Sequence, residues 1–104
     1  MQDPMKRVTI DNLPAEPLAA SSAFYQLYLP KVLEALESGQ DVMIVFDAAD
    51  YTHRAWRLAA VQGLARDAAP ARVNAVTGGS DNLAAMEKYL AKAPGVTGQY
   101  LEGS

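Results

Sequence analysis

Apolar residues follow two different spacings along the chain. Short apolar or alternating runs predict strands at residues 6–11, 41–47, 71–77 and 96–102. The run at 41–47, DVMIVFD, contains five consecutive apolar residues, which is typical of a strand buried on both faces of a parallel sheet. Between these runs apolar residues recur three or four positions apart, and this spacing predicts three helices.

The first predicted helix follows a segment, residues 12–17, that two prolines interrupt. Ser21 or Ser22 is its expected N-cap, and Gly39 is its expected end. Pro30 lies inside the helical pattern. Because proline removes a backbone hydrogen bond, we expect the helix to bend or split there.

The second predicted helix spans residues 51–69 and stops at Pro70. The third begins after Gly78 and Gly79, with Ser80 as its expected N-cap. Strands and helices therefore alternate, which favours βαβ units with a parallel sheet. The sequence predicts an α/β fold with three layers, a partial Rossmann-like parallel sheet of about four strands and three helices.

Composition limits the classes of protein that remain. The 104 residues fit one domain, expected at residues 5–102, while residues 1–4 are expected to be disordered or added for expression. With no cysteine and one histidine, disulfide scaffolds, cysteine zinc sites and histidine-rich metal sites are excluded, and no metal site is predicted. The net charge of -3 disfavours nucleic-acid binding, and no apolar run is long enough for a membrane helix. A cytoplasmic location is the default expectation.

A cluster of polar residues is expected beyond the carboxyl end of the strand at 41–47. Its members are Asp47, Asp50, Tyr51, His53 and Arg54. Ligands of open α/β sheets bind at this end, so the cluster could form a pocket for a small anionic or polyol ligand. The alternative, which we favour, is a solvated loop in which Asp50 is the N-cap of the helix. His53 has no evident partner in the sequence, and we expect it to be exposed and non-catalytic.

The turn at Gly78, Gly79 and Ser80 joins a strand to a helix. Backbone N–H groups at such a turn can bind a phosphate. The turn lacks both a lysine and the full G-x-G-x-x-G pattern, so a tight turn without a ligand is the favoured interpretation.

Small residues recur every four positions in the second predicted helix, at Ala55, Ala59 and Gly63. This stripe allows close approach of another backbone, either the sheet of the same chain or a helix of a second copy. Trp56 has the same two interpretations, as a core residue or as an interface anchor. The sequence leaves both questions open.

Four segments, in order, resemble the C-terminal half of the short-chain dehydrogenase/reductase family. LARDAAP (64–70) and ARVNAVTGG (71–79) resemble the family's helix end and the strand that follows it. YLPKVLEALESGQDVMIVF (28–46) resembles its helix with a Leu-Pro pair and the central strand, and YLAKAPGVTGQYL (89–101) its closing helix and last strand. The resemblance implies half of a Rossmann fold. It also implies a dimer contact through a four-helix bundle made by the helices that correspond to the predicted helix ending at Gly39 and the one at 51–69.

The chain departs from the family where the chemistry lies. It has no TGxxxGxG turn for a cofactor pyrophosphate. Ungapped alignment places Asp50 and Arg54 at the family's catalytic tyrosine and lysine, Pro17 at its asparagine, and Asp47 or Ala48 near its serine. Arginine does not release a proton as a general acid must, so no catalytic residue is predicted.

These absences favour a truncated, non-catalytic domain that acts through self-association or as an accessory or regulatory protein. The expected partner is a second copy, giving a homodimer, or a full-length homologous protein. An open sheet edge at residues 6–11 is a second surface that association could cover. No cofactor is predicted, because NAD(P) binding lacks the support of a glycine motif. The alternatives are a small-molecule or nucleotide-binding module, and an NAD(P)-dependent oxidoreductase-like protein completed by a partner.

Overall fold

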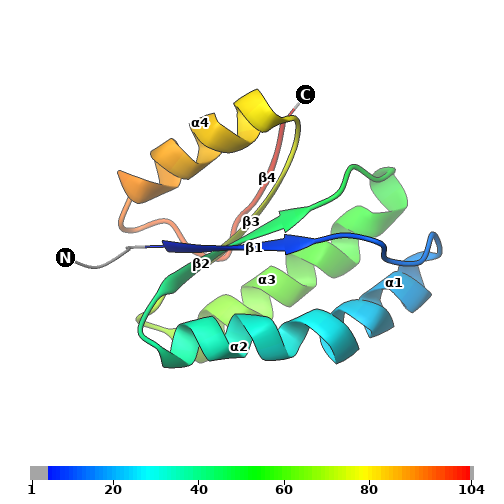
Figure 1. Ribbon diagram of the computed structural model, residues 1–104, viewed down its shortest axis with the longest axis horizontal. Helices are drawn as coiled ribbons and strands as arrows, with labels where there is room; N and C mark the ends of the chain where they lie inside the picture. Colours follow the sequence, from blue (N-terminus) through cyan, green and yellow to red (C-terminus); the bar gives the residue numbers. More distant parts are fainter. Residues whose placement is uncertain (1–4, 104) are drawn as a thin grey trace.

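A parallel sheet lies between two helical layers in the computed structural model, which describes residues 5–103 (Figure 1). Within that range the strands are β1 (Met5–Ile10), β2 (Asp41–Phe46), β3 (Val73–Thr77) and β4 (Tyr100–Glu102). They lie in the order β1-β2-β3-β4, and each neighbouring pair is parallel. The three-layer α/β fold expected from the sequence is confirmed. The expectation for residues 1–4 lies outside the described residues.

Helices cover both faces of this sheet. In the described range they are α1 (Pro17–Ala23), η1 (Phe24–Tyr28), α2 (Leu29–Glu37), η2 (Tyr51–His53), α3 (Arg54–Ala68) and α4 (Ser80–Ala91). Figure 1 shows α1, α2 and α3 on one face and α4 on the other. No helix among residues 5–103 combines the length and apolar character needed to cross a bilayer.

The continuous apolar run of β2 supplies side chains to two cores. Ile44 and Phe46 belong to the larger core under α1, α2 and α3, whereas Met43 and Val45 belong to the smaller core under α4. Successive side chains of a strand point to opposite faces, so both faces of β2 need apolar residues. This explains why the run at 41–47 does not alternate.

The first helix begins earlier than its serines predicted. It starts at Pro17 with Glu16 as N-cap, so Ser21 and Ser22 lie inside α1 and neither caps it. Proline suits a first turn because its φ is already helical and its missing N–H would have no partner there. The interruption expected from Pro30 is confirmed as the π-helical segment η1, which immediately precedes α2.

The last strand is shorter than the expected 96–102. Before Tyr100 the backbone makes two hydrogen bonds to β3, from Gly98 N to Val73 O at 2.7 Å and from Ala75 N to Gln99 O at 2.8 Å, but side chains supply the other bonds. Thr97 Oγ1 accepts a hydrogen bond from Val73 N at 3.0 Å, and Asn74 Oδ1 accepts one from Gln99 N at 3.0 Å. Strand pairing therefore begins only at Tyr100.

Candidate functional site

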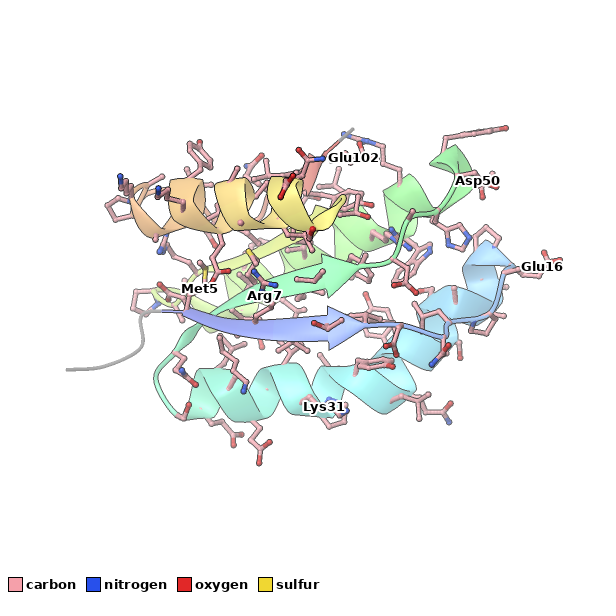
Figure 2. All side chains as sticks on the ribbon, turned by 45° about the horizontal axis from the view of Figure 1, so that its top comes forward. Met5, Arg7, Glu16, Lys31, Asp50 and Glu102 are labelled. Carbon is pink, nitrogen blue, oxygen red and sulfur yellow. The ribbon has the colours of Figure 1, made fainter. Side chains whose placement is uncertain are left out.

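A cavity of about 280 Å³ lies at the carboxyl end of the sheet. The loops that follow β1 and β2 and the start of α3 surround it, and its polar lining comes from Asp47, Asp50, His53 and Arg57. Figure 2 shows Asp50 and Glu16 at this end of the molecule and Met5 at the opposite end. Ligand sites of α/β sheets are found at this end, so the cavity is the candidate site.

His53 is buried, which corrects the expectation of an exposed histidine: its exposed fraction is 7%. Trp56 Nε1 donates a hydrogen bond to His53 Nδ1 at 3.0 Å, and His53 Nε2 lies 2.9 Å from the carbonyl oxygen of Ala15. An indole N–H only donates and a carbonyl only accepts, so these partners select the tautomer with the proton on Nε2. Both ring nitrogens are thereby engaged, and His53 ties the loop after β1 to α3.

Arg57 is a buried cation that the sequence analysis did not single out. It is 4% exposed, and its Nη1 donates to the carbonyl oxygen of Asp47 and to the hydroxyl of Tyr100, each at 2.9 Å. Its guanidinium carbon lies 4.5 Å from the centre of the Phe46 ring. Nε is also buried and has no hydrogen-bond partner among residues 5–103. The cation is thus held by neutral groups and keeps unused donors.

Asp50 is the N-cap of η2, as the favoured interpretation of the loop predicted. Its Oδ1 accepts hydrogen bonds from the Thr52 backbone N–H, at 2.9 Å, and from the Thr52 hydroxyl. These two bonds, the hydroxyl first, lower the pKa of the Asp50 carboxyl below its ordinary value because they stabilise the charged form. Asp50 therefore brings a negative charge to the rim of the cavity at neutral pH.

Two members of the predicted cluster lie outside the cavity lining. Tyr51 is 86% exposed. Arg54 forms an ion pair with Glu102 on β4, with 3.1 Å between Nε and Oε1. Both partners of that pair are about half exposed, so it contributes little to stability. The structure brings Asp47, Asp50 and His53 together and leaves Tyr51 and Arg54 on the surface.

The turn after β3 does not contribute to this cavity. Gly79, rather than Ser80, is the N-cap of α4, and no side chain caps it, so the expected role of Ser80 is wrong. Gly78 has a φ of +154°, and a Cβ there would come within 3.0 Å of Asn82 Cβ. The space beside the first glycine is thus filled by the chain itself, which supports the tight-turn interpretation.

The small-residue stripe of α3 points away from the sheet. Ala55 and Ala59 are exposed, Gly63 is half-buried, and no atom lies within 4 Å of a Cβ built on Gly63. The interpretation that this stripe packs on the sheet is wrong, since the buried face of α3 is formed by other residues: Arg57, Ala60, Val61, Leu64 and Ala65. Trp56 is half-buried and packs against the larger core. Its role as an interface anchor remains a prediction.

A signal for Arg57 was present in the sequence. It lies four residues after His53 and four before Val61, so it shares the buried side of the helix with them. A charged residue at a core position of a helix is uncommon and calls for a partner. The helix at 51–69 was correctly predicted, but its buried side was not assigned.

The fold and the cavity define a class: a Rossmann-type parallel sheet with a candidate ligand site at the carboxyl ends of its strands. The family model described as "Short chain dehydrogenase-like protein" (SDR-like) matches residues 8–103. The chain therefore belongs to the short-chain dehydrogenase-like family, as its resemblance predicted. No match was found among curated proteins or among solved structures.

The residues present do not fit the dinucleotide cofactor that such a family implies. The cavity of about 280 Å³ is at the lower limit for ligands of drug size, and a dinucleotide is larger. The loops after β1 and β2 contain no glycine-rich turn, and the turn at Gly78 is filled by Asn82. Among the described residues, no group of three or more histidine and acidic side chains could hold a metal ion.

Proposed function

We propose that this chain is a non-catalytic member of its family that acts by association, with a second copy of itself as partner. The observation that carries the proposal is the outward position of Ala55, Ala59 and Gly63 on α3. Small side chains let the backbone of a second helix approach closely. Leu33 on α2 is 38% exposed and lines a shallow groove with Leu64 of α3. We call Leu33, Ala55, Ala59 and Gly63 the two-helix face.

The spacing of the stripe suits a symmetric dimer. Ala55 and Gly63 each lie four residues from Ala59. Two antiparallel α3 helices related by a two-fold axis at Ala59 would set Ala55 of each copy against Gly63 of the other. Such an isologous contact needs only one self-complementary surface, which is the usual basis of homodimers. The family resemblance favours the same face, since it implies a bundle of the corresponding helices.

The residues at the family's catalytic positions also support association over catalysis. Asp50 and Arg54 stand at the positions of the family's catalytic tyrosine and lysine, and they are engaged with Thr52 and Glu102. A full-length homologue would present an equivalent pair of helices, so an accessory or regulatory role uses the same two-helix face.

The alternative surface is the open edge of β1, beside which a groove of about 510 Å³ runs along α2. Arg7 and Lys31, labelled in Figure 2, line that groove.

Ala59→Glu is the variant that tests this proposal, with molar mass measured by sedimentation equilibrium across micromolar concentrations. We expect the parent chain to be a dimer and Ala59→Glu to weaken dimerisation roughly tenfold or more, because a buried unpaired carboxylate opposes the contact. Ala85→Glu on α4 is the matched control, since Ala85 is also an exposed helical alanine. It should leave the dimer unchanged.

Two results would overturn the proposal. A parent chain that stays monomeric at high micromolar concentration would exclude self-association as its function. A dimer that both glutamate variants leave intact would place the contact elsewhere, with the β1 edge as the next surface to test.

A further inference from the structure

We propose that the cavity at the carboxyl end of the sheet binds a small monocarboxylate, whose carboxylate group is held by the guanidinium of Arg57. The site lies at the start of α3 and uses none of the four residues of the two-helix face. The proposal is therefore independent of the association proposed above, and either can fail without the other.

The unused donors of Arg57 are the first argument. A guanidinium has five N–H groups, and it binds a carboxylate best through two of them at once. In the structure Nη1 donates to Asp47 O and Tyr100 Oη. Nε has no partner, and no residue among 5–103 accepts a hydrogen bond from Nη2. Nε is sealed from solvent, whereas Nη2 is not among the sealed atoms, so Nη2 is the donor that a ligand in the cavity can reach. A carboxylate bound there would supply an acceptor to a guanidinium that is otherwise only partly hydrogen-bonded.

The uncompensated charge of Arg57 is the second argument. Among the described residues Arg57 forms no ion pair, although it is 4% exposed. Its positive charge faces the ring of Phe46 at 4.5 Å and that of Trp56 at 5.9 Å. Aromatic faces compensate a cation only partly, and buried charges in proteins are as a rule paired with an opposite charge. An anion in the cavity supplies the missing partner.

The other cavity walls indicate what kind of anion fits. Ile10, Leu13 and Pro14 form an apolar wall, and the volume of about 280 Å³ suits a ligand of few heavy atoms. Asp47 and Asp50 also line the cavity and are exposed at its rim, where their charges repel a dianion more than a monoanion. A short apolar body with one carboxylate matches these walls better than inorganic phosphate does.

The first measurement uses the unmodified chain and three probes: propionate, its neutral isostere propionamide, and inorganic phosphate. The side-chain Nε–H resonance of Arg57 is followed by ¹⁵N NMR during each titration, at constant pH and ionic strength. We expect propionate to shift this resonance in a saturable way at millimolar concentration. Propionamide and phosphate should shift it roughly tenfold less at equal concentration, because one lacks the charge and the other meets the two aspartates.

Two variants locate the site. Arg57→Met removes the guanidinium and keeps an unbranched apolar side chain in its place. Arg54→Met removes an exposed arginine from the same turn of α3 and is the matched control. In thermal unfolding, propionate should raise the midpoint of the parent chain and of Arg54→Met but not that of Arg57→Met, since a ligand stabilises only a protein that binds it.

Three results would overturn the proposal: an Arg57 resonance that none of the probes moves, an equal response to propionamide, or an equal response to phosphate. The NMR titration needs no substitution, so the proposal stays testable if Arg57→Met does not fold. Retention of the propionate effect in a folded Arg57→Met variant would also contradict it.

Discussion

Each end of the sheet holds a mostly buried arginine, but the two arginines have different surroundings. At the amino end, Arg72 Nε donates to Asp41 Oδ2 at 3.0 Å. Its Nη1 donates to the carbonyl oxygens of Leu90 and Ala93 at 3.1 and 2.7 Å. At the carboxyl end, Arg57 is more buried and has no carboxylate partner among the described residues. One cation is paired within the fold, and the other is not.

This difference separates a structural role from a binding role. Arg72 joins the start of β2 to the end of α4, so its hydrogen bonds hold two layers together. Arg57 borders a cavity, and its unused donors contribute nothing to the fold as it stands. Buried charges that are fully hydrogen-bonded make a fold sensitive to their removal. A buried charge without a partner costs stability, and a ligand is one means of offsetting that cost.

The largest expected effect comes from removing Arg72, with the removal of Arg57 as the comparison. Arg72→Met should lower the free energy of unfolding by about 3 kcal/mol, because it leaves Asp41 Oδ2 and the carbonyls of Leu90 and Ala93 without their side-chain donor, although the Arg72 backbone N–H still donates to Asp41 Oδ1. Arg57→Met should change it by no more than about 1 kcal/mol, since removing an unpaired buried charge offsets the loss of its hydrogen bonds to the Asp47 carbonyl and the Tyr100 hydroxyl. Urea denaturation followed by circular dichroism measures both values.

Arg66→Met serves as the control for these substitutions. Arg66 is exposed on α3, so its replacement should change stability by no more than about 0.5 kcal/mol. If Arg57→Met lowers the free energy of unfolding as much as Arg72→Met does, the two arginines do not differ in role. Arg57 would then be a second structural arginine, and its unused donors would no longer be an argument for a bound ligand.

Replacing His53 should have the next largest effect on stability, because its side chain joins the loop after β1 to α3 at the carboxyl end of the sheet. His53→Phe keeps an aromatic ring but leaves the Trp56 N–H and the Ala15 carbonyl without partners. We expect a loss of about 2 kcal/mol in the free energy of unfolding. A double-mutant cycle with Trp56→Phe isolates the bond between the two rings. A coupling energy near zero would show that this bond does not hold the cavity wall.

The order and type of the main elements could be predicted from the sequence because they depend on local patterns. The apolar run of β2 and the helical spacing of α3 can each be recognised from a few neighbouring residues. The predictions were wrong where the structure depends on partners that are far away in the sequence. β4 begins late because the side chain of Asn74, and not a backbone carbonyl of β3, accepts the hydrogen bond of the Gln99 N–H, 25 positions further along the chain.

The candidate site was predictable only in part for the same reason. Asp50 caps a helix through a residue two positions away, and its role was foreseen. His53 is buried by a hydrogen bond to Ala15, 38 positions away, and Arg57 by one to Tyr100, 43 positions away. Without those partners both side chains are expected to stay in solvent. Burial of polar groups is a property of the assembled fold, whereas capping is a property of the local sequence.

The smallest expected effect concerns the charge of Asp50 at the rim of the cavity. Thr52→Ala removes the hydroxyl that most lowers the Asp50 pKa, so this pKa should rise toward its ordinary value while staying below it, because the Thr52 backbone N–H still donates. Thr52→Ser keeps the hydroxyl and is the matched control. Carboxyl ¹³C titration by NMR measures each pKa.

The direction of the pH effect on stability follows from the same shift. A carboxyl whose pKa is lower in the folded state stabilises the fold fully at neutral pH, and this contribution is lost as the pH falls from about 4 through the folded pKa. Thr52→Ala should therefore lose less stability than the parent chain on acidification over that range, and Thr52→Ser should follow the parent chain. Equal pKa values of Asp50 in the three proteins would mean that the hydroxyl does not hold this charge at the rim. Asp47, and not Asp50, would then be the main source of the negative charge that disfavours phosphate in the cavity.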